Sequence, residues 1–289
     1  MKRVLFLTLL GLVILLIPGI PAQAATSAPK DKGLLITPLR QYINLNAGSQ
    51  KATSFTIANL TSAPLTINLS AKQFSVTDYT YDYRFAEPQT DWLKLSSGQI
   101  TLQPNQSHDI TYTIAIPAHT APGGQYYTLF ASANVSSGGL KSTVQAATLV
   151  YLTVNGSLTR TSQLHQAHVQ HLSFGKQINY SLEPINTGNI YYFIYVNGQL
   201  HGLSAKGATN PVTHILYPNK VRRLNGAIPA PILPGIYHAT FGYKADGGQS
   251  ITRSSYVIFI PPWFIALLLA TTLLLAKYFS KRKRTSKTS

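Results

Sequence analysis

Cysteine is absent from all 289 residues of this chain. Its absence excludes disulfide bonds, thiolate-bound metals and a cysteine nucleophile. Immunoglobulin-like domains outside eukaryotic cells usually carry a disulfide, so the absence also favours a bacterial surface, which we expect to be of the Gram-positive type.

Acidic residues are scarce too, with eight Asp and Glu against 24 Lys and Arg. Glu183 and Asp246 are the only acids between residues 157 and 258, which argues against hydrolysis by paired carboxylates there. Neither a Ser-centred nucleophile elbow nor a phosphate-binding loop occurs. We therefore predict that the protein is not an enzyme and that it uses no cofactor and no metal.

An apolar run opens the chain. Lys2 and Arg3 precede uncharged residues 4–17, and the small residues Ala22 and Ala24 flank Gln23 in the pattern that signal peptidase reads. We predict a signal peptide over residues 1–24 and, because no apolar period follows at once, a flexible leader over residues 25–33.

A second apolar run covers residues 260–279 and contains no charge before Lys277. A run of this length is enough to cross the hydrocarbon layer of about 30 Å, and a core helix would have to tolerate a wholly apolar circumference. The basic residues of the tail, 280–289, favour the cytoplasm. The expectation is a single-pass protein of the cell membrane with its N-terminal domains outside.

The formal net charge of +16 resembles that of a nucleic-acid-binding protein. However, eight of the 24 basic residues belong to the two terminal segments, and the others are spread thinly. A diffuse positive surface outside the cell would attract an anionic wall polymer. We predict a peptidoglycan-like wall polymer or a surface protein as partner, and no nucleic acid.

Between these segments, apolar and polar residues alternate with period two, which is typical of half-buried strands. Ile110, Tyr112, Ile114 and Ile116 are one such set, and turn residues recur every 8 to 12 positions, as in a β-sandwich. We predict an all-β fold of two tandem immunoglobulin-like β-sandwiches, residues 34–156 and 157–258, followed by the transmembrane helix. Asn197-Gly198 predicts a hairpin turn in the second unit.

Two short echoes favour duplication of one domain type. Pro122-Gly123 precedes a Tyr-containing strand in the first unit, as Pro234-Gly235 does in the second. The strand that ends at Asn59 is likewise similar to the one that ends at Asn186.

Several motifs of the first unit resemble one family. Leu35-Ile36-Thr37-Pro38, Asp91-Trp92-Leu93, residues 100–106 and Pro122-Gly123-Gly124 look like the N-terminal domain of WxL-interacting cell-surface proteins. The resemblance implies a Gram-positive-type surface protein with two immunoglobulin-like domains, a membrane helix and a basic tail. It also implies binding to peptidoglycan or a surface protein. PapD-like pilus chaperones share some of these motifs.

Four aromatic residues, Tyr79, Tyr81, Tyr83 and Phe85, alternate along one segment and are expected to share one strand face. Such a face could stack on sugar rings or anchor a protein, or it could cover the edge of the sandwich. Four acids lie in or beside the same segment and could hold calcium, or they could keep the hairpin soluble. They are Asp78, Asp82, Glu87 and Asp91.

Lys220, Arg222 and Arg223 form a basic cluster that could meet phosphates of a wall polymer or a lipid, or could be an ordinary solvated turn. His165, His168 and His171 are spaced by three residues, but no nearby carboxylate would orient an imidazole toward a metal. We interpret these histidines as linker residues.

These observations predict a membrane-anchored extracellular protein for binding or adhesion, or a scaffold, that engages a wall polymer or another surface protein. The alternative is a PapD-like chaperone or assembly factor for secreted surface subunits.

Overall fold

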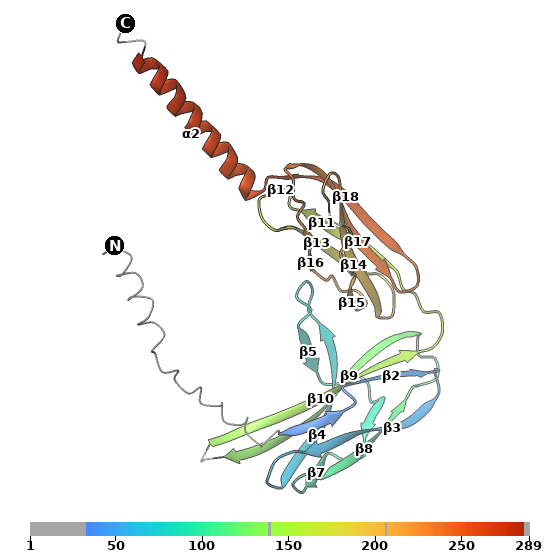
Figure 1. Ribbon diagram of the computed structural model, residues 1–289. Coiled ribbons are helices and arrows are strands. Elements are labelled where there is room, and N and C mark those ends of the chain that lie inside the picture. The colour runs from blue at the N-terminus through green and yellow to red at the C-terminus, as the bar shows by residue number, and fades with distance from the viewer. Residues whose placement is uncertain (1–32, 138–139, 206, 286–289) are drawn as a thin grey trace, which may run out of the picture.

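A computed structural model describes residues 33–137, 140–205 and 207–285 (Figure 1). The described part is all-β apart from one C-terminal helix, which confirms the predicted fold class. The signal peptide and nearly all of the leader fall outside the described residues.

The first β-sandwich is built from strands β1 to β10 in two sheets (Figure 1). One sheet has the order β1-β3-β8-β6, and the other has the order β2-β10-β9-β4-β5 with β7 paired to β4. The strands are β1 (Leu34–Thr37), β2 (Arg40–Leu45), β3 (Gln50–Asn59), β4 (Leu65–Val76), β5 (Tyr83–Ala86), β6 (Leu93–Leu95), β7 (Gln99–Leu102), β8 (Ser107–Ala115), β9 (Gly123–Ser137) and β10 (Leu140–Val154).

The second β-sandwich is smaller and contains strands β11 to β18. Its sheets have the orders β11-β13-β16 and β12-β18-β17-β14-β15. The strands are β11 (Ser162–Val169), β12 (Leu172–Ser173), β13 (Gln177–Asn186), β14 (Tyr192–His201), β15 (Val212–Leu216), β16 (Leu224–Pro229), β17 (Gly235–Ala245) and β18 (Ser250–Phe259).

The first two strands of the chain, β1 and β2, lie in different sheets of the first sandwich. β1 pairs antiparallel with β3, and after the cis peptide Thr37–Pro38 the chain enters β2, which pairs parallel with β10. β2 covers only residues 149–154 of β10. Residues 140–148 of β10 are therefore not paired with β2.

The alternating residues named above are buried as the period predicts. Ile110, Tyr112, Ile114 and Ile116 enter the core of the first sandwich. A second core cluster belongs mainly to the other sandwich, but it also includes Phe74, Val76, Tyr81 and Tyr151 of the first. The two sandwiches thus share buried side chains.

Asn59 and Asn186, the two similar strand ends of the sequence, have similar surroundings in the structure. Each is fully buried at the end of its strand. The Asn59 amide nitrogen donates to the carbonyls of Ala63, Leu102 and Gln103, and its oxygen accepts from the backbone of Thr61. The amide nitrogen of Asn186 donates to the carbonyls of Ile190 and Leu216, and its oxygen accepts from Gly188.

The predicted hairpin at Asn197-Gly198 is wrong. Both residues lie inside β14, and Asn197 pairs with Gly242 of β17. Glycine is needed at position 198 for space, since a Cβ there would lie 2.8 Å from atoms of Ile228 and Tyr180.

The helix α2 spans Pro262–Thr285, and residues 262–279 are long and apolar enough to cross a membrane. It is the single helix of this kind among the described residues, and none of that stretch is buried inside the protein. The helix begins two residues later than predicted and continues through Lys281–Arg284 of the expected tail. Pro261 and Pro262 account for the later start, because proline suits the first turn of a helix but not its interior.

Candidate binding surfaces: the joint and the free edge of β10

Residues 77–82, here called the joint turn, link β4 to β5 and bend sharply. Tyr79 and Tyr81 have φ angles of 65° and 59°, which a strand does not allow. The Thr80 hydroxyl donates to an Asp82 carboxylate oxygen at 2.6 Å, and the backbone N–H of Thr77 donates to the carbonyl of Asp82 at 3.0 Å. Asp82 therefore closes the turn, and no group of metal-ligating side chains is found in the described residues.

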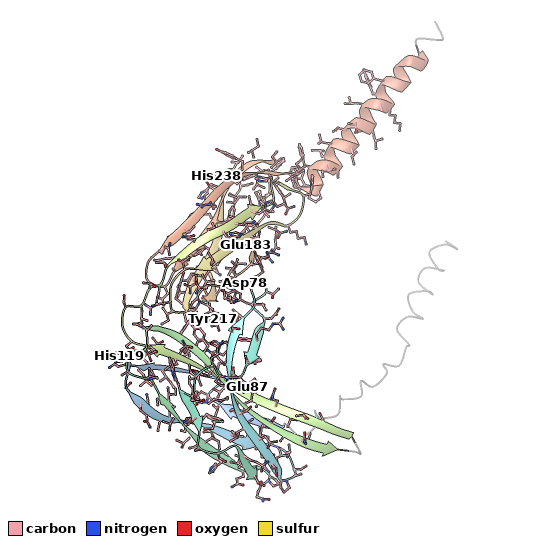
Figure 2. All side chains as sticks on the ribbon, turned by 180° about the vertical axis from the view of Figure 1, so that it is seen from behind. Asp78, Glu87, His119, Glu183, Tyr217 and His238 are labelled. Atoms are coloured by element: carbon pink, nitrogen blue, oxygen red, sulfur yellow. The ribbon has the colours of Figure 1, made fainter. Side chains whose placement is uncertain are left out.

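The joint turn is bound to residues 217–223 of the second sandwich. The backbone N–H of Tyr79 donates to the carbonyl of Val221 at 2.7 Å, and the Arg223 N–H donates to the carbonyl of Tyr79 at 3.0 Å. The carboxylate of Asp78 accepts from the N–H of Val221 at 2.9 Å and lies 3.6 Å from the Lys220 ammonium. Asp78, Tyr217 and Glu183 are labelled around this contact in Figure 2.

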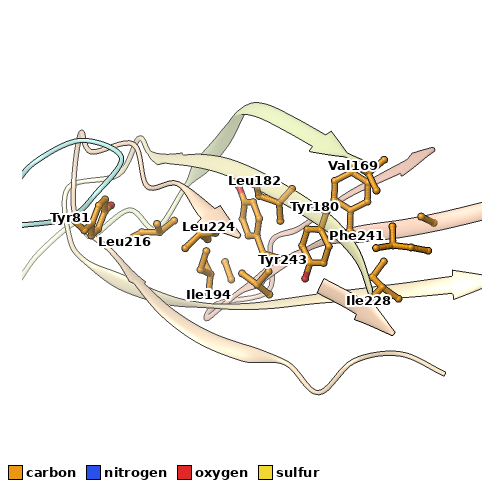
Figure 3. Close-up of a cluster of buried hydrophobic side chains, with 14 of the residues drawn as sticks. Tyr81, Val169, Tyr180, Leu182, Ile194, Leu216, Leu224, Ile228, Phe241 and Tyr243 are labelled. Atoms are coloured by element: carbon orange, nitrogen blue, oxygen red, sulfur yellow. The ribbon is translucent and has the colours of Figure 1, made fainter. Parts of the chain in front are cut away.

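Tyr81 inserts its ring into the second sandwich. Its hydroxyl donates to the carbonyl of Lys220 and accepts from the N–H of Tyr217, both at 3.3 Å, and the Arg222 guanidinium lies 4.6 Å from the ring centroid. Figure 3 shows Tyr81 beside Leu216 at one end of the buried row. Burial raises the pKa of Tyr81 well above its usual value.

The four aromatic residues consequently do not form one strand face, which corrects the prediction. The left-handed backbone at Tyr79 and Tyr81 breaks the period, and Tyr81 is 9% exposed. Only Tyr83 and Phe85 lie on β5, where their rings stack at 6.2 Å and remain about half exposed.

The three basic residues do not form a freely solvated patch, because each has a partner at the joint. Lys220 pairs with Asp78, and Arg222 donates to the carbonyl of Ile215 at 2.7 Å besides covering Tyr81. Arg223 forms an ion pair with the buried Glu183 at 2.7 Å. The two sites predicted separately therefore meet in one interface between the sandwiches.

A tyrosine cluster extends this interface. The hydroxyls of Tyr151 and Tyr217 are 2.9 Å apart, and the Tyr126 hydroxyl accepts from the N–H of Tyr191 at 3.0 Å. Burial raises the pKa of Tyr151 to about 12 and raises that of Tyr217 further. A hydrogen-bonded aromatic cluster of this kind fixes one angle between the two sandwiches.

A cavity of about 280 Å³ opens beside the tyrosine cluster, between the sandwiches. Arg40 and Arg222, one from each sandwich, are among its lining residues, and no carboxylate is. Its lining also includes His214, whose pKa is lowered by burial and by Arg222. The cavity suits a small anionic group.

The histidines of the sequence motif lie on an outer strand. His165 and His168 belong to β11, and His171 follows it. Nδ1 of His171 lies 3.0 Å from the carbonyl oxygen of Tyr256. The structure thus places these residues in and next to a strand and not in a linker.

The feature that the sequence pattern did not predict is the length of the β9–β10 hairpin, with 15 residues in each strand. It extends away from the second sandwich (Figure 1). The β-branched and small residues on both sides of Ser137 could have indicated that both strands are long.

Among the described residues, one edge of this hairpin is unpaired over Leu140–Thr148, although β1 of the other sheet lies close to β10. There β10 pairs with β9 on one side in an unbroken register, and among the described residues no strand pairs with its other side. The backbone N–H of Leu149 donates to Leu39 on the β2 side, so by the period of two the N–H groups of Thr143, Gln145 and Ala147 point to the free edge.

No family model and no curated protein matches the chain. Among solved structures it is similar to the class 5 fimbriae chaperone CfaA, with 12% identity and a TM-score of 0.44 over 78% of this chain and 99% of that one. It is also similar to a Salmonella enterica SafA pilin–SafB chaperone structure, with 11% identity and a TM-score of 0.40 over 80% and 98%. A PapD-like domain of human CEP192 has 10% identity and a TM-score of 0.33 over 49% and 98%. At these identities the likeness concerns the fold alone, and the resemblance to WxL-interacting proteins stays a prediction.

Proposed function

We propose that this protein is a membrane-anchored binding protein that holds an extended segment of another secreted or surface protein by strand addition to β10. The observation that carries the proposal is the free edge over Leu140–Thr148. An unpaired edge of this length presents a row of N–H and C=O groups that an extended chain can pair with.

The sequence of this edge supports its use for binding. Proteins usually protect long edges with proline, several charges or a bulge. Residues 140–148 contain no proline, one charged residue (Lys141) and no irregularity in their register with β9. An edge that is left open in this way is a hazard unless a partner covers it.

The free edge ends at the cavity between the sandwiches. Leu149, the first residue covered by β2, is in register with Arg40, which lines the cavity together with Arg222. A segment that pairs along residues 140–148 would end beside Arg40, at the border of this cavity. A carboxylate at that end of the segment would be stabilised there.

Stacking on a wall polymer has less support. Of the four aromatic residues predicted for that role, Tyr81 is buried in the joint and Tyr79 belongs to the turn that binds the second sandwich. Tyr83 and Phe85 remain exposed. We therefore favour a protein partner, held permanently by a scaffold or transiently by an assembly factor.

A proline at the free edge tests the proposal. Gln145→Pro removes one N–H that faces the free edge and leaves the β9 ladder intact, and Gln145→Ala is the matched control that keeps the N–H. A photoreactive residue in place of Thr143 in the full-length protein should cross-link a partner in living cells. The cross-link should be lost with Gln145→Pro and kept with Gln145→Ala.

Two outcomes would contradict the proposal. Cross-linking that survives Gln145→Pro would show that backbone pairing is not the mode of binding. A cross-link to the chain's own N-terminal residues would show that the protein covers its own edge. Dissociation of the partner after secretion would distinguish an assembly factor from a scaffold.

A further inference from the structure

Three apolar side chains form a continuous row on the outer face of the second sandwich, beside the start of α2. Leu172 of β12 is in register with Ile258 of β18, which is in register with Ile236 of β17. All three are exposed, Ile236 by 71%, while neighbours such as Tyr237 and Val257 point inward and are buried.

The loops at this end of the sandwich carry more exposed apolar side chains. Leu203 is 78% exposed and Ile232 is 65% exposed, and Phe174 follows β12 directly. The indole N–H of Trp263 in α2 donates to the carbonyl of Ile232 at 3.2 Å. We call the set of six residues the helix-end patch: Leu172, Phe174, Leu203, Ile232, Ile236 and Ile258.

The same sheet face becomes more polar with distance from the helix. The row after the helix-end patch consists of Tyr256, His238 and His201, which are in register across three strands. His238 is labelled near the helix end of the sandwich in Figure 2. The next row is Ser254, Thr240 and Gln199. Successive rows are about 7 Å apart, because side chains on one face recur every second residue.

This order matches the profile of a membrane surface, where aliphatic groups give way to Tyr and Trp and then to hydrated polar groups over several ångströms. Both acids of the second sandwich lie elsewhere. Glu183 pairs with Arg223 at the joint, and the N–H of Asp246 bonds Phe193 beside residues of the first sandwich. No carboxylate of the second sandwich therefore has to be dehydrated or held near anionic lipids at the helix end.

The connection to α2 is too short to hold the sandwich away from a bilayer. Only Ile260 and Pro261 separate β18 from the helix, and the Ile260 N–H is bound to the carbonyl of Ser173 at 2.9 Å. Two residues span at most about 7 Å. The helix-end patch is thus continuous with the apolar surface of α2.

We propose that the helix-end patch is a lipid-binding surface that lies in the interfacial layer of the membrane crossed by α2. The second sandwich is then seated at a fixed depth and orientation, with the Tyr256 row at the headgroups. The proposal depends on α2 spanning a membrane and is independent of what β10 binds.

Depth-dependent quenching tests this seating, because a chain without cysteine accepts a single fluorescent label at any chosen site. The full-length protein is reconstituted in nanodiscs of phosphatidylcholine and phosphatidylglycerol with a spin label high on the acyl chain. Labels at Ile236→Cys and Leu203→Cys should lose fluorescence. The matched control, Thr240→Cys, lies two rows further along β17 and should not.

Equal and weak quenching at positions 236 and 240 would overturn the proposal. So would protection of position 236 from a water-soluble quencher without any quenching by lipid, since that result indicates coverage by a second copy of the chain. A double variant, Ile232→Ser with Ile236→Ser, changes two exposed side chains and should reduce the quenching of the Leu203→Cys label. Unchanged quenching in this variant would also contradict the proposal.

Discussion

Tyr151 and Tyr217, one from each sandwich, join their hydroxyl groups at 2.9 Å in a buried site, with their rings stacked at 6.3 Å. Burial disfavours the charged form of both tyrosines and so keeps both hydroxyls protonated at ordinary pH. The angle between the two sandwiches is therefore linked to the neutral state of these tyrosines.

Alkaline pH should destabilise the protein through this pair. Burial raises the pKa of Tyr151 to about 12 in the folded protein. In the unfolded chain a tyrosine has its usual pKa of about 10. Between these values the folded state holds more protons, so stability is full below about pH 10 and falls as pH rises, by about 1.4 kcal/mol per pH unit for each such tyrosine. Urea unfolding at increasing pH measures the slope, and Tyr151→Phe should make it shallower. If the free energy of unfolding did not fall up to about pH 11, the raised pKa of Tyr151 would be contradicted.

Loss of the Tyr81 ring should loosen the joint. Tyr81→Ala removes the hydrogen bonds to Lys220 and Tyr217 and the surface on which Arg222 lies, at a cost of about 3–5 kcal/mol for a buried aromatic side chain. Spin labels at Ser107→Cys and Thr252→Cys, one on each sandwich, should report a broader distance distribution.

The control for the Tyr81 experiment is Phe85→Ala, which removes an exposed ring from the adjoining strand β5. It should leave the distance distribution unchanged. If Tyr81→Ala also leaves the distribution narrow, the Tyr81 side chain does not set the angle between the sandwiches.

The buried asparagines should be essential for folding stability. Asn59→Ala removes the hydrogen bonds to the carbonyls of Ala63, Leu102 and Gln103 and to the backbone of Thr61, and the buried Leu102 carbonyl left unsatisfied costs about 1–3 kcal/mol by itself. Asn186→Ala should have a similar effect on the second sandwich. Chemical denaturation measures the loss, and Asn134→Ala, at an exposed position of β9, should change stability by less than about 0.5 kcal/mol.

The sequence was sufficient to predict the sandwich strands because period two reports burial directly. Tyr237, Ala239, Phe241 and Tyr243 alternate along β17 and are all buried, as expected. The helix could be predicted with similar ease, because a long uncharged apolar run is typical of a segment that spans a membrane.

The joint could not be predicted from the same period. Tyr79 and Tyr81 alternate as strand residues do, but they are held in a left-handed turn by hydrogen bonds within residues 77–82 and by the bond from the Tyr79 N–H to the Val221 carbonyl. The hydrogen bonds to the second sandwich connect residues about 140 positions apart, as in the pairing of Tyr81 with Lys220. Neither a local pattern nor local charge contains that information.

Gly198 illustrates the same limit and yields a last prediction. Its local context, Asn-Gly between apolar residues, favours a turn, yet in β14 the glycine makes room for Tyr180 and Ile228. In Gly198→Ala the new Cβ would lie 2.8 Å from a carbon atom of each, so the sandwich must shift at a cost of about 1–3 kcal/mol. The matched control is Gly98→Ala, where nothing lies within 4 Å of the added carbon, and thermal unfolding compares the two. If Gly198→Ala were as stable as the parent, tight packing against Tyr180 would not explain this glycine.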